Sequence, residues 1–249
     1  MMKNFLTVLI ILFLSPFVNS CAIQTNVIKS LQDVKKSILK IETWARLGAC
    51  DDETGVCAEP ELVSMGSGAV VLYNNRKAVL TAAHVCKQES FEKFVSTHNG
   101  HFFLKAIDRD DKEYIIKVIK YDHNQDICLL ASISGELPPY LKISSKKPEY
   151  AEIVYNLAAP LGIINQQMVP AYQGFFFGKS DGHAFYSLAV AQGSSGSPVV
   201  NVKGELIGMI HSVHYRFHHI SLSATYEQLW NFLKIEGNYT LEFQNSSPR

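Results

Sequence analysis

The sequence predicts an all-β fold of two six-stranded antiparallel β-barrels followed by a C-terminal helix. Short β-prone runs recur along the chain and are separated by turn signals, which is typical of barrels rather than of parallel α/β units. A turn-rich stretch from Gly135 to Tyr140, with two prolines, divides these runs into two sets. Near the end of the chain, apolar residues change to helical spacing.

Each half of the chain is expected to supply six strands. In the first half, Asn74, Asn75 and Arg76 form a turn between the second strand and the third. The two halves are joined by Gly135–Lys147, so a cleft between two barrels is expected, where ligand sites often form. The expected strands lie near 38–47, 66–74, 77–83, 102–108, 113–121, 126–132, 152–158, 167–177, 183–190, 197–201, 205–215 and 219–223.

The helix at the end begins after Thr225, whose hydroxyl can cap a segment from Tyr226 to Lys234 with apolar Leu229, Trp230 and Leu233. A second, short helix is a weaker expectation for residues 22–36. The predicted organisation is a domain over 37–235, with barrel one over about 37–134, barrel two over about 148–224, the helix over 225–234, and a loose tail over 236–249.

Residues 1–21 are predicted to be an export signal. Lys3 gives a short basic region, and the apolar run from Phe5 to Leu14 is too short to favour a membrane-spanning helix. Val18 and Ser20 suit cleavage after Ser20. The same segment resembles a lipoprotein signal, in which Cys21 would be acylated. We therefore expect an exported protein, periplasmic or extracellular, and both alternatives for Cys21 stay open.

The chain has 249 residues with 23 basic and 23 acidic side chains. This balance gives no reason to expect nucleic acid or an anionic membrane as a partner, so membrane contact is expected only through a lipid at Cys21.

The segment Gly193–Pro198 favours an exposed nucleophile. Glycine allows a tight turn and close approach of a substrate around Ser195. The backbone N–H groups of Gly193 and Ser195 could then converge on one point and hold a developing oxyanion. A Gly/Ser cluster alone is more often a simple loop.

Two further segments strengthen this interpretation. A β-prone run from Val79 ends at His84, and Asp126 opens an apolar strand. Serine is a poor nucleophile at neutral pH, and it needs a base whose tautomer is fixed by an anion. Ser195, His84 and Asp126 supply these three roles, in the chain order His, Asp, Ser.

These motifs together resemble the chymotrypsin-fold (trypsin-like) serine peptidases. Thr81–His84 is similar to the histidine motif of that family, Asp126–Leu130 to its aspartate motif, and Gly193–Pro198 to its serine motif. Gly66–Val71 and Ala159–Gly162 are similar to segments of the HtrA-like and glutamyl-endopeptidase-like branches. The resemblance covers about residues 37–235. It implies a serine endopeptidase that hydrolyses peptide bonds of a protein or peptide substrate through an acyl-enzyme, without a cofactor.

The four cysteines after Cys21 suggest disulfides in an exported chain. Cys50 and Cys57 bracket a polar loop, so a local bridge is natural. Cys86 and Cys128 each lie two residues past a member of the His84–Asp126 pair. If both segments are strands, these two cysteines come within bridging distance behind the pair, and two buried free thiols are the alternative.

The resemblance also suggests residues that bind substrate. Ala189, six positions before Ser195, would lie near the floor of the specificity pocket, and its lack of charge disfavours a Lys or Arg preference. His211 lies on the strand expected to wall that pocket, where it could favour Glu at the cleaved position. The alternative is a pocket for small apolar side chains, with His211 hydrogen-bonded in the wall. No metal site is expected, since His214, His218 and His219 fit an exposed turn better than a ligand set.

Two alternatives to a peptidase stay open. One is a catalytically silent binding protein on the same fold, because a fold does not guarantee an activity. The other is an esterase that uses the same serine chemistry. An α/β-hydrolase is disfavoured because its catalytic residues follow the order Ser, Asp, His.

Overall fold

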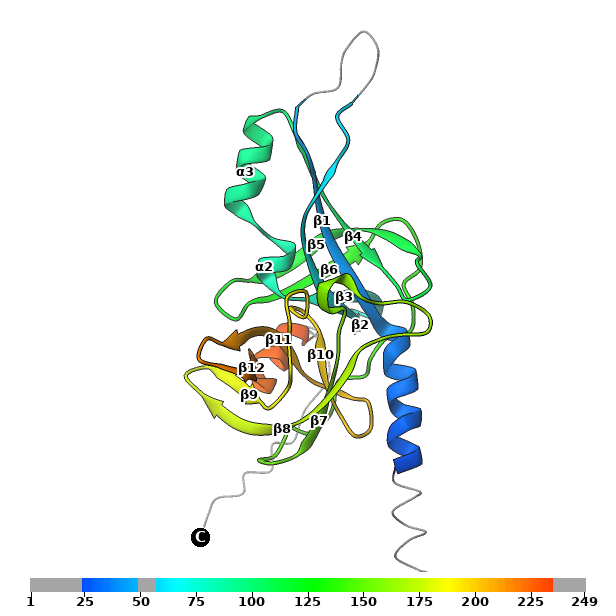
Figure 1. The fold of residues 1–249 in the computed structure, drawn as a ribbon, viewed down its shortest axis with the longest axis vertical. Coiled ribbons are helices and arrows are strands. Elements are labelled where there is room, and N and C mark those ends of the chain that lie inside the picture. The colour runs from blue at the N-terminus through cyan, green and yellow to red at the C-terminus, as the bar shows by residue number, and fades with distance from the viewer. Residues whose placement is uncertain (1–23, 49–56, 235–249) are drawn as a thin grey trace, which may run out of the picture.

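The chain forms two closed antiparallel barrels of six strands each, one above the other in Figure 1. The computed structural model describes residues 24–48 and 57–234. The strand order is β1-β2-β3-β6-β5-β4 in barrel one and β10-β11-β12-β9-β8-β7 in barrel two. This architecture confirms the predicted fold class.

Barrel one consists of β1 (Ile38–Arg46), β2 (Glu61–Tyr73), β3 (Arg76–Thr81), β4 (His101–Ile107), β5 (Glu113–Asp122) and β6 (Ile127–Ser132). Barrel two consists of β7 (Ile153–Leu157), β8 (Ala171–Ser180), β9 (His183–Tyr186), β10 (Pro198–Asn201), β11 (Leu206–His214) and β12 (Phe217–Ala224).

Along the strands, buried side chains alternate with exposed ones. In β5, Tyr114 and Ile116 face the core while Glu113 and Lys117 face solvent. By contrast, the last four residues of β3 are all buried, so both faces of this strand are covered there. The β2–β3 turn forms at Asn74 and Asn75, both with positive φ, which is the backbone that two-residue hairpin turns require.

The linker between the barrels contacts both of them. The backbone N–H of Leu141 donates to the carbonyl of Val70 in barrel one at 2.8 Å, and that of Ser144 donates to the carbonyl of Leu206 in barrel two at 2.9 Å. The linker thus fixes the barrels against each other, and the buried core is continuous from one barrel into the other.

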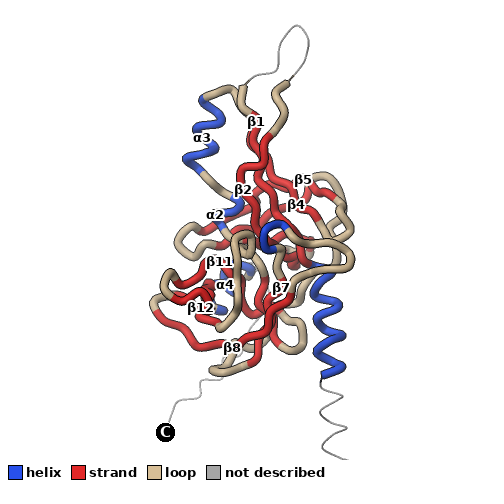
Figure 2. Tube along the Cα trace, in the orientation of Figure 1, coloured by secondary structure: helices blue, strands red, loops and turns tan. Residues whose placement is uncertain are grey.

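The helices lie around the barrels, as Figure 2 shows. They are a helix over residues 24–34, the 3₁₀ turns η1 (Lys35–Ser37) and η2 (Pro160–Gly162), and the α-helices α2 (Ala83–Cys86), α3 (Glu89–Thr97) and α4 (Tyr226–Leu233). Thr225 caps α4 as predicted: its hydroxyl accepts from the Gln228 N–H at 3.2 Å, and the Gln228 side chain accepts from the Thr225 N–H at 2.7 Å. None of the helices in the described ranges has the length and apolar character needed to cross a membrane.

Four predicted strands have clearly different ends. The strand expected from 66 already starts at Glu61. The run expected over 77–83 ends at Thr81, because the chain turns into α2. The strand expected from 167 starts only at Ala171, because Asn165 and Met168 close a turn with two mutual backbone hydrogen bonds. The strand expected over 183–190 ends at Tyr186. The predicted export signal with Cys21, the Cys50 half of the local bridge and the 236–249 tail lie outside the described residues.

Candidate active site

His84 and Asp126 come together at the ends of two neighbouring strands of barrel one. His84 lies in α2, directly after β3, and Asp126 directly precedes β6, which pairs with β3. The Nδ1 atom of His84 lies 2.7 Å from Oδ2 of Asp126, and the backbone N–H of His84 donates to Oδ1 at 2.9 Å. Both carboxylate oxygens therefore hold the same residue, which fixes the orientation of the imidazole.

The charge of Asp126 is set by these contacts. Burial by itself raises the pKa of the Asp126 carboxyl, but the hydrogen bonds and the charge of His84 outweigh burial and lower that pKa. Asp126 also has a positive φ of 52°, a conformation that Asp tolerates better than most residues. The result is a carboxylate ionised at neutral pH that faces the His84 ring.

A disulfide lies directly behind this pair. Cys86 and Cys128 are bonded, with their Cα atoms 6.5 Å apart, and both are fully buried. This confirms the predicted bridge, but the argument used for it was wrong for Cys86. Cys86 belongs to a helical turn rather than a strand, because the N–H groups of Val85 and Cys86 both donate to the carbonyl of Ala82.

Ser195 lies in the turn between β9 and β10. Two glycines with positive φ flank it, Gly193 at 89° and Gly196 at 90°. A Cβ atom at Gly193 would lie 2.8 Å from the backbone nitrogen of Leu161, and one at Gly196 would lie 2.1 Å from the carbonyl oxygen of Ser67. Both positions therefore require glycine for conformation and for space.

The two N–H groups expected to hold an oxyanion have no acceptor within the described part of the chain. Neighbouring donors are used: the Ser194 N–H donates to Ala191 and the Gly196 N–H to Ile210. The N–H groups of Gly193 and Ser195 donate to no described residue. The carbonyl of Gln192 accepts from Leu161 at 2.8 Å, and in a trans peptide the next N–H points the opposite way. The N–H of Gly193 therefore points away from Leu161.

His211 connects the two halves of the site. Its carbonyl oxygen accepts a hydrogen bond from Ser195 Oγ at 3.3 Å, while its Nδ1 atom lies 3.9 Å from Oδ2 of Asp126. No hydrogen bond between Ser195 and the His84 ring occurs among the residues that the structure describes. Contacts of this kind are often long before a substrate binds.

The side chain of His211 is buried rather than open to a pocket. Its Nδ1 atom lies 2.9 Å from Ser212 Oγ, its ring centroid lies 5.3 Å from that of His183, and its Nε2 atom is buried without a hydrogen-bond partner. Burial lowers the pKa of His211 to about 4, so the ring is neutral at neutral pH. Ala189 is exposed in the loop after β9, and its place in the pocket floor stays a prediction.

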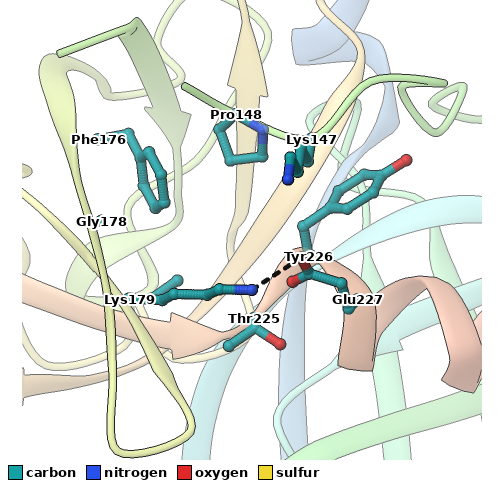
Figure 3. A pocket seen from close by; sticks show the side chains of 9 residues that line it. Lys147, Pro148, Phe176, Gly178, Lys179, Thr225, Tyr226 and Glu227 are labelled. Carbon is teal, nitrogen blue, oxygen red and sulfur yellow. Dashed lines mark hydrogen bonds and ion pairs between the residues drawn. The ribbon is translucent and has the colours of Figure 1, made fainter. Parts of the chain in front are cut away.

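A separate pocket on barrel two does not belong to this site. Figure 3 shows its lining around Phe176 and Tyr226, with Lys179 paired to Glu227 at 2.9 Å. None of the candidate catalytic residues lines it. The Lys179 charge is paired with Glu227, the start of α4 is capped by Thr225, and Lys147 also lines the pocket.

The fold and this constellation agree with a comparison of the sequence with known families. The model of the trypsin-like peptidase domain matches residues 66–209, more than half of the chain. The chain belongs to the trypsin-like peptidase family. No curated protein matches the sequence well enough to count as a relative. A trypsin-like peptidase is a hydrolase that acts on protein or peptide substrates.

Within the ranges that the structure describes, no group of three or more His, Cys, Asp or Glu side chains is arranged to hold a metal ion. His214 instead packs its ring on Tyr215 and Phe217, with centroids 5.0 and 5.3 Å away. Sequence reasoning missed one residue of the site, Ser67, although it quoted the Gly66–Val71 segment as part of the resemblance. The glycines on both sides of Ser67 were the available signal.

Proposed function

We propose that the chain is a serine endopeptidase that uses Ser195, His84 and Asp126. The observation that carries this proposal is the pairing of an oriented His84–Asp126 unit with a serine whose two neighbouring oxyanion donors, the N–H groups of Gly193 and Ser195, lack acceptors among the described residues. These are the parts that acyl transfer requires.

The proposed reaction has two steps. Ser195 Oγ, turned about χ1 toward His84, attacks the carbonyl carbon of the peptide bond and gives its proton to His84 Nε2. The C–N bond then breaks, and His84 returns that proton to the leaving amine. In the second step, His84 takes a proton from water as the water attacks the acyl-enzyme. His84 then gives that proton to Ser195 Oγ as the bond to the acyl group breaks and the acid is released. Asp126 stabilises the imidazolium in both steps, and each oxyanion donor is worth about 10²–10³ in turnover.

The proposal also covers the branch of the peptidase family, the export of the protein and the side chain preferred at the cleaved position. Gly66–Val71 and Ala159–Gly162 support a place near the HtrA-like and glutamyl-endopeptidase-like branches, and residues 1–21 support export, with or without a lipid at Cys21. The buried, neutral His211 supports a pocket for small apolar side chains over one for Glu. Comparing cleavage after Ala or Val with cleavage after Glu tests this preference.

The experiment that tests the activity is labelling of the purified protein with a fluorophosphonate probe, with the adduct mapped by mass spectrometry. We expect labelling at Ser195 that is lost in Ser195→Ala and in His84→Ala. A peptide library then separates an endopeptidase from an esterase. Absence of labelling in folded wild-type protein would support the alternative, a binding protein on the peptidase fold.

A further inference from the structure

Ser67 is a residue of barrel one whose hydrogen bonds reach the active-site loops of barrel two. It lies in β2 and is fully buried. Its backbone N–H donates to the carbonyl of Ser195 at 2.7 Å, and its hydroxyl donates to the carbonyl of Gly193 at 2.7 Å. The same hydroxyl accepts from the N–H of Ala159 at 2.9 Å. One side chain thus bonds two backbone groups from loops that are far apart in the sequence.

These bonds act on the peptide groups beside the oxyanion donors. The Ser67 hydroxyl holds the carbonyl that follows Gly193, and the Ser67 N–H holds the carbonyl of Ser195. The peptide before Gly193 is held by the N–H of Leu161, and Leu161 belongs to the loop that Ala159 anchors on Ser67. Because a peptide is planar, the hydrogen bond from Leu161 to the Gln192 carbonyl sets the direction of the Gly193 N–H. The Ser67 bond to the Gly193 carbonyl holds the next peptide and so restricts rotation of the backbone at Gly193.

The surroundings leave Ser67 no freedom to make other contacts. Its own carbonyl accepts from the Thr81 hydroxyl at 2.7 Å. The strand also approaches the catalytic loop closely, since a Cβ atom at Gly66 would lie 3.0 Å from the carbonyl oxygen of Ser195. A buried hydroxyl that gives one hydrogen bond and accepts another cannot be replaced by an apolar group without leaving a buried carbonyl and a buried N–H unpaired.

We propose that Ser67 is a positioning residue for the oxyanion hole: from barrel one, its hydroxyl sets the conformation of the Gly193 turn and of the Ala159–Leu161 loop. This inference rests on the proposed serine peptidase activity and deepens it. Ser67 does not touch the substrate or the reacting atoms, so its effect passes through the backbone of Gly193.

The test is Ser67→Ala in the purified protein, with Ser144→Ala as a matched control. Ser144 is also a buried serine that bonds a carbonyl, that of Lys146 at 2.9 Å, and it lies in the linker. We expect Ser67→Ala to lower kcat about 10- to 100-fold with little change in KM, since a displaced donor weakens stabilisation of the transition state only. We expect Ser144→Ala to leave kcat unchanged.

A second readout separates positioning from a structural role. A peptide aldehyde forms an oxyanion adduct with the serine, whereas the matching peptide alcohol cannot. We expect Ser67→Ala to weaken inhibition by the aldehyde about as much as it lowers kcat/KM, to leave inhibition by the alcohol unchanged, and to leave the shape of the pH–kcat profile unchanged, because His84 and Asp126 keep their contacts. If Ser67→Ala does not fold, Ser67→Cys is measured, where the weak thiol donor should give the same pattern with a smaller loss.

Unchanged kcat, an equal loss of aldehyde and alcohol binding, or an equal loss in Ser144→Ala would overturn the inference while leaving the peptidase activity intact. If the wild-type protein itself neither labels with fluorophosphonate nor cleaves peptides, the proposed function is wrong, and this outcome is distinct from a failure of Ser67 alone.

Discussion

The two barrels hold their parts of the candidate site in different ways. In barrel one, His84 and Asp126 follow and precede paired strands, share two hydrogen bonds, and are backed by the Cys86–Cys128 disulfide. In barrel two, Ser195 lies in a turn whose glycines and carbonyls are held by hydrogen bonds from other segments, including barrel one.

This difference suggests that the two parts of the candidate site depend on different regions of the fold. The proposed acid–base half, His84 and Asp126, lies within one barrel and is cross-linked there, so its geometry should depend little on the second barrel. The proposed nucleophile and the proposed oxyanion donors depend on how the barrels meet, since Ser67 in barrel one bonds both Gly193 and Ser195. Substitutions that disturb the His84–Asp126 pair and substitutions at the interface between the barrels should therefore affect activity and stability in separable ways.

The largest effect is expected from breaking the acid–base half with Asp126→Asn. We expect kcat to fall about 10³- to 10⁴-fold, because an amide neither stabilises the imidazolium nor fixes the tautomer of His84. Steady-state kinetics measure the loss. The matched control is Asp108→Asn, since Asp108 is a buried carboxylate in a turn of barrel one that accepts a hydrogen bond from Tyr114. The control should lose stability but not kcat, and an Asp126→Asn variant with more than about a tenth of the activity would contradict the assigned role.

The same two regions differ in how well the sequence predicts them. Strand alternation and turn residues such as Asn74 and Asn75 are local signals, so all strands of both barrels were expected with errors only at their ends. The helix α3 was missed. Phe91, Phe94 and Val95 have the three- and four-residue spacing of a helix face, and this signal was available but short.

The candidate site was predictable where residue types carry the chemistry. His84, Asp126 and Ser195 were proposed from their motifs, and the Cys86–Cys128 disulfide was correctly predicted from the cysteine positions. Contacts such as those of Ser67, which lies 126 residues from Gly193 and 92 from Ala159, depend on how the barrels dock. No local pattern encodes such contacts, because they form only once both barrels have folded.

The second-largest effect is expected from removing the Cys86–Cys128 disulfide of barrel one. Removing the bridge with Cys86→Ala and Cys128→Ala together should lower the free energy of unfolding by about 4 kcal/mol, because the bridge closes a loop between residues 42 positions apart. We expect kcat at 25 °C to change less than about threefold, since the two hydrogen bonds between His84 and Asp126 remain. Urea unfolding and steady-state kinetics measure both quantities.

Wild-type protein that has been fully reduced is a second comparison for this double variant, because it keeps both sulfur atoms of the bridge, while reduction also breaks the disulfide of Cys57. Equal stability of oxidised and reduced wild type would show that the bridge does not stabilise barrel one. A large loss of kcat in folded double variant would show instead that the hydrogen bonds alone cannot hold the acid–base half in place.

The smallest effect is expected where the two halves meet, at His211. Burial lowers the pKa of His211 to about 4 from an ordinary value of 6.5, while Asp126 raises that pKa and His183 and His84 lower it. Between these pH values the unfolded chain binds a proton that the native protein does not, so stability falls as the pH drops through this window, by up to about 3 kcal/mol. The lowered pKa of Asp126 acts at lower pH and in the same direction: its contribution to stability is lost only as the carboxylate becomes protonated.

His211→Gln should therefore reduce the difference in unfolding free energy between pH 7 and pH 4 by about 3 kcal/mol, as measured by urea unfolding at both pH values. If the variant and the wild type lose the same stability on acidification, the burial of a neutral His211 between Asp126 and His183 is not what links folding to pH. If the difference in pH dependence is reduced as expected, His211 contacts Asp126 as a neutral ring. The charge that orients His84 is then that of Asp126, in barrel one.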